Sequence, residues 1–468
     1  MAKAATAARK GFRIEHDSMG ELQVPASALW GAQTQRAMDN FHISGRPMPA
    51  AFVRALALVK ASAAVVNGHL GLLDSARAEA IVAAATAVAG GAHGEQFPID
   101  RYQTGSGTST NMNANEVIAH VAGAAAKLAI HPNDHVNLGQ SSNDTIPTAL
   151  RVMAVRETVG ALLPALAHLR KTIDRQAKAI GGTVKTGRTH LMDAMPLTFA
   201  QEFGTWSAQL ASAQGRIEDS LMRTRRLPIG GTAIGTGINA HPKFGKGVAK
   251  ALSAATGVKF EQNANTFEGL AAHDDLVELS GQLSALAVAL MKIGNDLRWM
   301  NSGPLAGLGE IELKALQPGS SIMPGKVNPV IPEALCMVCA QVMGLHTANT
   351  VAGQSGNFQL NVMLPLLACN LDEAIGLLAH SMTELADNAI ATLKIRKDKV
   401  AEALDRNPIL VTALNPVIGY EKAAKIAKRA YAEGRPVLDV ALEDSGLSEK
   451  QLRVLLDPVK LTKGGIAG

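Results

Sequence analysis

Cysteine is scarce: three residues in 468 are too few for a disulfide framework and suit a reducing compartment. Aromatic residues make up only 3% of the chain, which argues against a surface that stacks the bases of single-stranded nucleic acid. The formal net charge is only +5 and no long basic block occurs, so nucleic acid is not expected as a partner. We expect a cytoplasmic protein, or one of the mitochondrial matrix if the source is eukaryotic.

Long hydrophobic runs are also missing. Residues 334–371 contain no Asp, Glu, Lys or Arg, yet the longest apolar run there, residues 362–369, is far shorter than the ~20 residues that a bilayer requires. The pattern predicts a long element buried on all sides, as in the centre of an oligomer, and no membrane span. Residues 1–10 are basic and rich in alanine but lack the apolar core of a secretory signal, so we expect a short tail there rather than a transit segment.

The clearest pattern in the chain is the helical periodicity of its apolar residues. Apolar residues spaced by three and four run through residues 276–300, 152–180 and 199–217. These repeats predict three long helices that pack nearly parallel to their partners. Pro164 lies inside the second repeat and is expected to kink that helix without ending it.

The expected length of the helices and the content of Pro and Gly change along the chain, and these changes predict three domains. Residues 1–140 mix short helices with loops, residues 141–397 carry the long helices, and residues 398–468 hold short helices broken by Pro and Gly. In the first domain we expect helices at 51–68 and 76–89. Asp74 is placed to cap the second of these helices, and the best strand signal is at residues 22–24. The predicted fold class is mainly α, built on a central long bundle.

Three polar segments rich in small residues, 102–115, 139–144 and 317–329, indicate where chemistry takes place. Such runs offer backbone N–H groups and hydroxyl or amide donors, which is how loops hold a small anion. The third segment adds a cation, Lys326, and has glycine hinges, which predicts a mobile loop that closes over an anionic substrate. Its serines suit either a nucleophile or a base. His190, in a fourth segment, is the titratable candidate.

Several patterns that suggest cofactors lack the required context. Cys336 and Cys339 have CxxC spacing, but no second pair follows. His131 and His135 are four residues apart without the glutamate that a metalloprotease helix carries. Residues 235–240 fit a loose dinucleotide fingerprint but follow no convincing strand. We therefore expect neither a metal nor any other cofactor.

The third segment is also the basis of a family resemblance. Residues 319–329, Gly-Ser-Ser-Ile-Met-Pro-Gly-Lys-Val-Asn-Pro, resemble the signature loop of the fumarase/aspartase superfamily. Further segments occur in the order found in that superfamily, namely Ser106-Gly-Thr108 with Asn111-Met-Asn, His131-Pro-Asn-Asp134, Ser141-Ser-Asn143 and Gly187-Arg-Thr-His190. The similarity extends from about Phe12 to Ala424, and within the superfamily the chain most resembles the class II fumarases.

The resemblance implies a fold, an assembly and a reaction. The three-domain fold places a five-helix bundle of each chain in a 20-helix core of a homotetramer, with active sites shared by three subunits. The implied reaction is the reversible, metal-independent hydration of fumarate to L-malate, a step of the tricarboxylic acid cycle. It is an anti addition or elimination of water through an aci-carboxylate intermediate. Ser320 matches the base, His190 the residue that handles water, and Glu333 the carboxylate paired with it.

The resemblance also assigns binding positions for the dicarboxylate. The residues that match substrate-holding positions are Ser106, Gly107, Thr108, Ser141, Ser142, Asn143, Thr189, Ser321, Lys326, Val327 and Asn328. A second, non-catalytic dicarboxylate site matches His131, Pro132, Asn133 and Asp134.

Two alternatives to a fumarase remain open on these residues. Ser109-Thr110-Asn111 reads more like an aspartate ammonia-lyase, although His190 stands where aspartases carry Gln. A non-catalytic structural relative would be expected to have lost the loop residues, whereas Ser320, Lys326 and Glu333 are all present.

Overall fold

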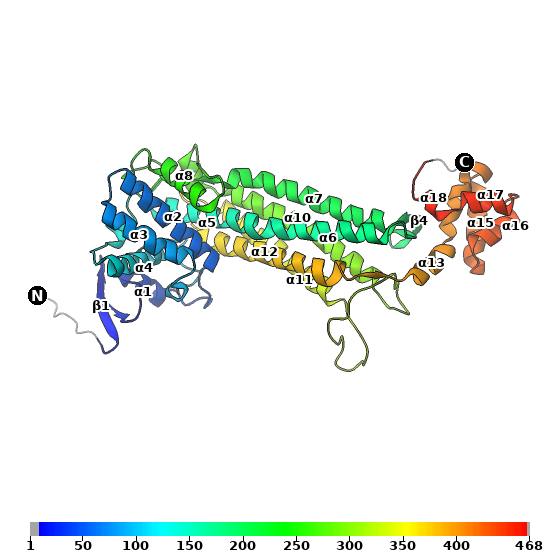
Figure 1. The fold of residues 1–468 in the computed structure, drawn as a ribbon, viewed down its shortest axis with the longest axis horizontal. Helices are drawn as coiled ribbons and strands as arrows, with labels where there is room; N and C mark the ends of the chain where they lie inside the picture. The colour runs from blue at the N-terminus through cyan, green and yellow to red at the C-terminus, as the bar shows by residue number, and fades with distance from the viewer. Residues whose placement is uncertain (1–8, 466–468) are drawn as a thin grey trace, which may run out of the picture. The chain divides into compact units, whose positions relative to one another are not determined.

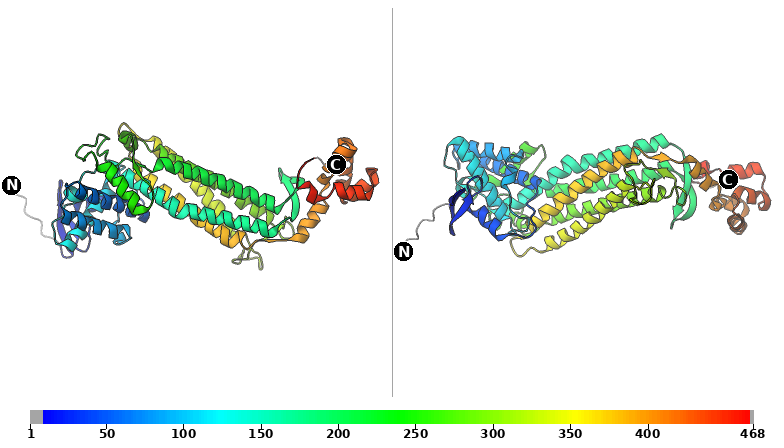
Figure 2. Two further views of the ribbon diagram at one scale, coloured as in Figure 1. Left: turned by 45° about the horizontal axis from the view of Figure 1, so that its top comes forward. Right: turned by 90° about the horizontal axis from the view of Figure 1, so that it is seen from below.

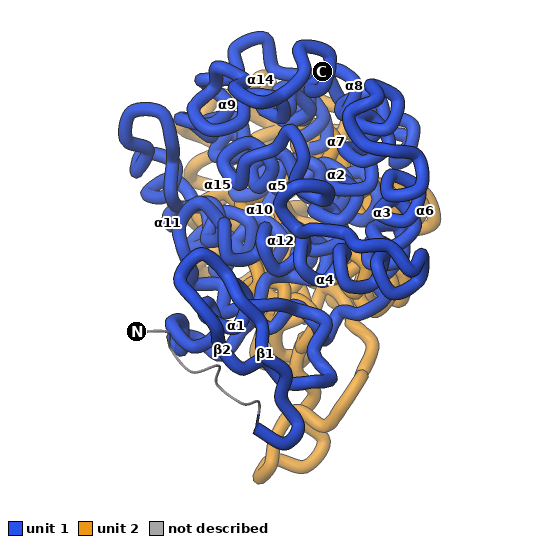
Figure 3. The backbone as a smooth tube through the Cα atoms, turned by 90° about the vertical axis from the view of Figure 1, so that its left-hand side faces the viewer, with its two compact units in different colours: residues 1–164, 214–287, 340–379 blue, residues 165–213, 288–339, 380–468 orange. Residues whose placement is uncertain are grey.

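The computed structural model describes residues 9–465 and is mainly α-helical, which confirms the predicted fold class (Figure 1). Contacts divide the chain into two compact units (Figure 3). Unit 1 holds residues 1–164, 214–287 and 340–379, and unit 2 holds residues 165–213, 288–339 and 380–468. The boundaries between the two units fall within the long helices and not near residues 140 and 397. The three predicted domains are therefore not tested by this division and stay a prediction. Most of the expected N-terminal tail lies outside the described residues.

The N-terminal part of unit 1 is a helical cluster preceded by a β-hairpin. Strands β1 (Phe12–Asp17) and β2 (Gly20–Pro25) pair antiparallel, which confirms the strand expected at 22–24. The helices of this unit outside the long bundle are α1 (Ala32–Asn40), α2 (Ala50–His69), α3 (Ser75–Ala89), α4 (Thr108–Ala126), α8 (Phe244–Thr256) and α9 (Thr266–Ala271). Helices α2 and α3 match the predicted ones, and Asp74 caps α3 by accepting the N–H of Arg77 at 3.0 Å.

Helix α2 is buried because it is surrounded by other helices. It packs against α3, α4, α5 and α8, and its small and β-branched residues allow close approach. Phe52, Leu56 and Val59 have at most 1% of their surface exposed. Lys60 on the same helix is also fully buried. A helix enclosed in this way can hold a polar side chain in a fixed position beneath the neighbouring loops.

Five long helical runs lie side by side in the views of Figures 1 and 2. They are α5 (Ser142–Glu157) continued by α6 (Leu163–Ile180), α7 (Phe199–Thr224), α10 (Asp274–Met300), α11 (Val330–Gln354) and α12 (Leu364–Leu385). The three predicted apolar repeats fall on α10, α5–α6 and α7. On α10 every member from Leu276 to Leu297 is fully buried, so the repeat forms the packing seam as predicted.

The irregularity expected at Pro164 begins earlier in the helix. A π-helical turn, Thr158–Leu162, joins α5 to α6 immediately before the proline. Proline cannot donate a backbone hydrogen bond, and a wider turn relieves the clash of its ring with the preceding turn. The helix therefore continues to Ile180, directly before Gly181 and Gly182.

Unit 2 carries a β-hairpin that the sequence did not reveal. Strands β3 (Val184–Thr189) and β4 (Met192–Thr198) pair antiparallel with a bulge between Thr186 and Arg188. Lys185 is buried in β3, and a buried charge interrupts the apolar alternation by which a strand is recognised. Shorter pairs join β5 (Arg226–Leu227) to β6 (Glu261–Gln262) in unit 1, and β7 (Ile311–Glu312) to β8 (Lys394–Ile395) in unit 2.

Short helices make up the C-terminal part of unit 2, as predicted. They are α13 (Lys397–Asp405), the 3-10 helix Pro408–Leu414, α14 (Asn415–Ile418), α15 (Tyr420–Glu433), α16 (Val437–Asp444), α17 (Glu449–Leu455) and α18 (Pro458–Leu461). Leu414, Ile426, Val440 and Leu452 are fully buried in a local apolar core that holds these helices together.

Candidate active site

Two of the predicted polar segments form the first turns of helices in unit 1. Helix α4 begins at Thr108, directly after Gly107, and α5 begins at Ser142, directly after Ser141. The first backbone N–H groups of a helix have no partner within it and carry partial positive charge. Each segment therefore offers a carboxylate both N–H groups and hydroxyl groups.

The turn before α4 requires glycine at position 107. Gly107 has a φ of 71°, and a Cβ atom there would lie 2.9 Å from a methyl group of Ile146. This turn brings the hydroxyl oxygens of Ser106 and Thr108 to 2.8 Å from one another. The two hydroxyls thus form a paired donor group at the start of the helix.

A side-chain bridge joins the two helix starts. Asn111 Nδ2 on α4 donates to Ser142 Oγ on α5 at 3.0 Å. Ser141 and Asp144 form a capping box, in which Asp144 Oδ1 accepts the N–H of Ser141 at 2.9 Å. The structure thus holds Ser106, Gly107 and Thr108 near Ser141, Ser142 and Asn143, and we call these six residues the anion cradle.

Asp144 is a site residue that sequence reasoning missed. Its carboxylate is fully buried, and Oδ2 accepts the N–H groups of Gly230 and Thr232, each at 2.9 Å. Asn143 Nδ2 donates to the carbonyl of Ala233 in the same loop at 2.8 Å. Burial raises the pKa of Asp144, although its backbone hydrogen bonds oppose that shift. The signal available in the sequence was its position: an Asp three residues after a serine is typical of a capping box at the start of a helix.

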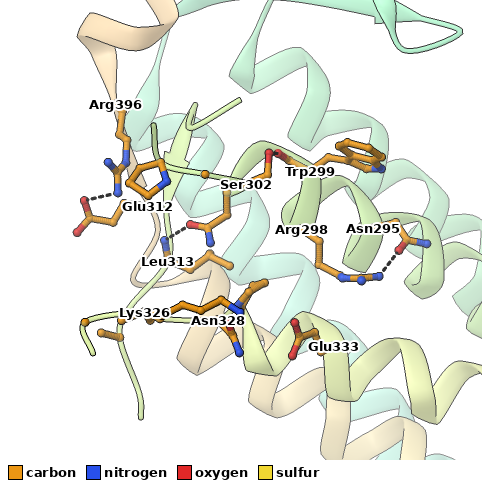
Figure 4. A pocket seen from close by; sticks show the side chains of 17 residues that line it. Asn295, Arg298, Trp299, Ser302, Glu312, Leu313, Lys326, Asn328, Glu333 and Arg396 are labelled. Atoms are coloured by element: carbon orange, nitrogen blue, oxygen red, sulfur yellow. Dashed lines mark hydrogen bonds and ion pairs between the residues drawn. The ribbon is translucent and has the colours of Figure 1, made fainter. Parts of the chain in front are cut away.

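The second part of the candidate site is a cavity of about 800 Å³ in unit 2 (Figure 4). Lys326, Val327 and Asn328 from the signature loop line it together with Glu333 from the first turn of α11. Arg298 from α10 lies across from Glu333 in Figure 4, and its guanidinium donates to Asn295 Oδ1 at 2.9 Å. The cavity combines cations, amides and two carboxylates, of which Glu312 is paired with Arg396 at 3.3 Å. Binding of a dicarboxylate and handling of a proton require such groups.

The signature loop, residues 317–329, is closed at its base by hydrogen bonds. Gly319 N–H donates to the Lys326 carbonyl, and Asn328 Nδ2 donates to the Gly319 carbonyl, both at 2.7 Å. A Cβ at position 319 would lie 2.7 Å from the Lys326 oxygen, so only glycine fits. The tip of the loop is exposed, with Ile322 at 84%. A fixed base and an exposed tip suit a loop that closes over a ligand.

Ser320 is held at the start of this loop by two backbone donors. Its Oγ accepts the N–H of Ile322 at 3.2 Å and the N–H of Met323 at 3.0 Å. Two N–H dipoles aimed at one oxygen stabilise negative charge on it. This geometry favours the role of base for the serine, which its sequence context had left open.

His190 lies at the tip of the β3–β4 hairpin. His190 and Leu191 occupy the two central positions of the turn with φ values of 55° and 63°. Such positions usually hold Asn or Gly, and non-glycine residues in left-handed conformations cluster at functional sites. The imidazole and Thr189 are exposed. The hairpin thus presents a titratable side chain to the surroundings.

A buried ion-pair network fixes this hairpin within unit 2. Glu310 is 2% exposed, and its two oxygens lie 2.8 Å from Lys185 Nζ and 2.8 Å from Arg188 Nη2. Lys185 also pairs with Glu202 at 2.8 Å. Glu310 precedes the signature loop, so the network ties the strand that carries His190 to the segment that leads into that loop. Sequence reasoning missed Lys185, Glu202 and Glu310.

The predicted site residues thus fall into three groups. Those of the anion cradle are held near one another in unit 1, whereas Lys326, Val327, Asn328 and Glu333 line one cavity in unit 2. The remaining four predicted active-site residues do not line that cavity; they are Thr189, His190, Ser320 and Ser321.

The segment of the expected second dicarboxylate site lies in unit 1. His131, Pro132 and Asn133 line a cavity of about 490 Å³, and His131 Nδ1 accepts the N–H of Asp134 at 3.2 Å. Arg13 lines the same cavity, but its guanidinium already donates to backbone carbonyls, among them that of Trp30 at 2.6 Å. The second site stays a prediction.

Metal ligation finds no support in the described part of the chain. Among residues 9–465, no group of three or more His, Cys, Asp or Glu side chains is arranged to hold a metal ion. Cys336 and Cys339 lie in helix α11, and burial raises the pKa of Cys339 to about 12, so that thiol stays protonated and is a poor metal ligand.

Comparison with known proteins agrees with the fold. Residues 20–344 match a family described as Lyase, and residues 410–463 match one described as Fumarase C C-terminus. The class that these matches define is a helical lyase.

Similarity to individual proteins identifies the family within this class. The chain is 68% identical over 455 residues to a class II fumarate hydratase of Xylella fastidiosa, covering 97% of this chain and 96% of that protein. It is 58% identical to a second such protein, from Pseudomonas aeruginosa, covering 97% and 99%. The crystal structure of a class II fumarase from Schistosoma mansoni superposes with a TM-score of 0.94 at 38% identity, covering 96% and 99%. The chain belongs to the class II fumarate hydratase family.

Proposed function

We propose that the chain catalyses the reversible addition of water to fumarate, giving L-malate. The observation that carries this proposal is Ser320, held by two backbone N–H groups within an intact family loop. Relatives up to 68% identical bear the name fumarate hydratase class II, which supports hydration over ammonia release from aspartate. Water is small and neutral, so the binding residues have to recognise only the dianion.

In the direction of elimination, the Ser320 alkoxide, stabilised by the N–H groups of Ile322 and Met323, takes a proton from the methylene carbon next to one carboxylate. The electron pair moves into that carboxylate as the aci form, which carries two negative charges beside the single charge of the other carboxylate. This intermediate needs fixed donors and a cation around it. The electron pair then forms the double bond as the hydroxyl group leaves, and His190 supplies the proton that makes it water. Glu333 is the carboxylate paired with His190, by resemblance to the family.

The anion cradle and Lys326 divide the binding of the two carboxylates in this proposal. Ser106, Thr108 and Ser142 offer hydroxyl donors at two helix starts, which favour an anion. Lys326 and Asn328 supply a cation and an amide at the cavity. These residues have fixed backbone positions, so little reorganisation is needed when charge develops in the transition state.

We also propose a homotetramer whose long helices pack together, with active sites shared by three subunits. Among residues 9–465, four helices are apolar and long enough to span a membrane by length and composition alone, and α11 is one of them. Only 28% of its most apolar window is buried, and Met337 and Val351 are 69% and 51% exposed. A second copy of the chain would cover this apolar face. Sedimentation equilibrium tests this, and a monomer at micromolar concentration would contradict it.

A cytoplasmic location is proposed on the three free cysteines, which suit a reducing compartment. Fractionation of source cells, with immunodetection of the protein in the soluble cytosolic fraction, tests it. Recovery in a membrane fraction or an oxidising compartment would contradict it.

A two-substrate assay tests the proposed reaction. Purified protein treated with a chelator is given fumarate, whose ultraviolet absorbance falls on hydration, and in a parallel sample L-aspartate, from which ammonia is assayed. We expect loss of fumarate absorbance and no ammonia. Ammonia release without fumarate hydration would assign the chain to the aspartases, and turnover of neither substrate would favour a structural role.

A further inference from the structure

Lys60 is a fully buried cation on α2, and no role in the proposed mechanism has been given to it so far. Its Nζ donates to Asn137 Oδ1 and to Gln140 Oε1, each at 2.9 Å. Both acceptors are neutral amides, and among the described residues no carboxylate lies within ion-pair distance of Nζ. Removing a charge from water without an ionic partner is costly, so such a group is retained only where its charge or position is useful.

The partners of Lys60 belong to the segment that leads into the anion cradle. Gln140 directly precedes Ser141, and Asn137 lies four residues before it. Asn137 Oδ1 also accepts from Asn111 Nδ2 at 3.3 Å, and the same amide group donates to Ser142 Oγ. Lys60 is thus connected to the Ser142 hydroxyl through two amide side chains.

A second residue of α2 holds the same segment without a charge. Asn67 lies seven residues after Lys60, which places both on one face of the helix. Its Nδ2 donates to the Leu138 carbonyl at 2.9 Å. Asn67 and Lys60 both tether the segment that precedes Ser141 to α2, but only Lys60 also brings a charge. Variants of the two residues can therefore distinguish tethering from an electrostatic effect.

One charged group, the Asp144 carboxylate, partly offsets the charge of Lys60. Asp144 on α5 is the charged group that faces it, and α3, α4 and α8, which also pack against α2, contribute no charge that shifts its pKa. The Asp144 carboxylate is itself bound by the backbone N–H groups of Ser141, Gly230 and Thr232. The lysine therefore adds to the positive ends of α4 and α5 at the cradle.

We propose that Lys60 is a positioning residue that fixes the Asn137–Gln140 segment and whose buried charge raises the affinity of the anion cradle for a carboxylate of the substrate. Lys60 does not touch the substrate in this proposal. The inference rests on the proposed function, since it concerns binding of the same dicarboxylate.

The proposal has a consequence for pH dependence. Burial lowers the pKa of Lys60 to about 7, against the smaller opposing effect of Asp144. The side chain is charged below that pH and loses its proton above it. Affinity for the dianion should therefore fall as the pH rises through about 7, and a bound dianion should draw a proton onto the lysine.

Lys60→Met tests the charge, because it keeps the length of the side chain and removes the cation. We expect KM for fumarate to rise about 10-fold or more, with kcat changed by less than about 3-fold. The decline of affinity above neutral pH should disappear as well. Asn67→Ser is the matched control: it loosens the same segment without altering charge and should keep the wild-type pH dependence of KM.

A second variant is informative if Lys60→Met fails to fold. Asn137→Asp keeps an acceptor for Lys60 and neutralises its charge by a direct ion pair, so KM should rise in this variant too. In the wild-type enzyme, calorimetry in two buffers of different ionisation enthalpy should show proton uptake when succinate binds above neutral pH.

A folded Lys60→Met or Asn137→Asp enzyme with wild-type KM and pH profile would overturn the inference, as would succinate binding without proton uptake. Wild-type turnover of fumarate is measured in the same series. Its absence would contradict the proposed function itself, and the two failures are thereby distinguishable.

Discussion

The Asn111 side chain on α4 donates to the Ser142 hydroxyl on α5 across 3.0 Å, so two helix starts are tied directly to one another. Asn111 is 1% exposed, and a buried amide makes the link rigid. The positive ends of both helices are thereby kept near one another, although 31 residues of sequence separate the two side chains. Binding of a dianion should depend on this link as much as on the residues that touch the ligand.

Asn111→Ala should raise KM for fumarate roughly 3- to 10-fold with a smaller change in kcat, because it removes the two hydrogen bonds of the Asn111 amide, to Ser142 and to Asn137, that position a binding group. Steady-state kinetics measure the effect. Asn115→Ala is the control, since Asn115 is equally buried one turn further along α4 and its amide donates to Met112 Sδ. Equal effects of the two variants on KM would show that only helix stability is involved.

Ser320→Ala should lower kcat by roughly 10²- to 10⁴-fold, the usual contribution of a positioned base. Binding of succinate should change little, because the variant leaves the anion cradle intact. Single-turnover kinetics with malate and calorimetry with succinate separate the two effects. A near-normal kcat would mean that the loop serine is only a ligand.

Lys326→Ala and His190→Asn should affect different kinetic constants. Lys326 meets charge in both the ground state and the transition state, so its loss should raise KM and lower kcat together. His190 handles water, and its replacement should lower kcat while succinate still binds. If His190→Asn instead weakened binding and spared kcat, the roles assigned to these residues would have to be revised.

Glu310→Gln should destabilise the protein, because it removes the buried carboxylate that Lys185 and Arg188 share and leaves Lys185 with Glu202 alone. Breaking a buried pair costs about 3–5 kcal/mol, which should appear as a lower Tm. Glu312→Gln provides the comparison: Glu312 pairs with Arg396 at 3.3 Å and its side chain is 49% exposed, so its loss should cost under about 1 kcal/mol. Similar Tm values for both variants would contradict the role of the network.

Asp372→Asn should stabilise the protein at neutral pH but not in acid. Burial raises the pKa of Asp372 from 3.8 to about 6, with help from Glu157 and Glu373. The folded protein therefore holds a proton that the unfolded chain has lost between these values, and stability falls as the pH rises through that window. The gain in Tm from the substitution should grow over the same range. A gain that does not depend on pH would point to packing instead.

The sequence predicted much of the fold because long helices leave a strong periodic signal. The repeat from Leu276 to Leu297 is fully buried, and the Asp74 cap is where the pattern placed it. The β3–β4 hairpin was missed because Lys185 is buried in it and is satisfied by Glu202 and Glu310, contacts that no local pattern reveals.

The same contrast applies to the site. Gly-, Ser- and Asn-rich segments marked the anion cradle and the signature loop, since such composition rarely serves packing. Lys60 was not predicted, and Asp144 was given no role within segment 139–144, because a lone charge in a helix usually faces solvent. Only the tertiary structure shows that both side chains are buried. The family resemblance, and not the spacing, supplied the role of Glu333.

Hydration of fumarate in deuterated water tests the central claim most directly. Purified, chelator-treated protein is incubated with fumarate, and the product is analysed by nuclear magnetic resonance and by chiral chromatography. Anti addition at a site with one base predicts L-malate as the only product. Its methylene carbon should carry a single deuterium, in a single configuration. Unchanged fumarate, or malate labelled in both configurations at that carbon, would contradict the assignment.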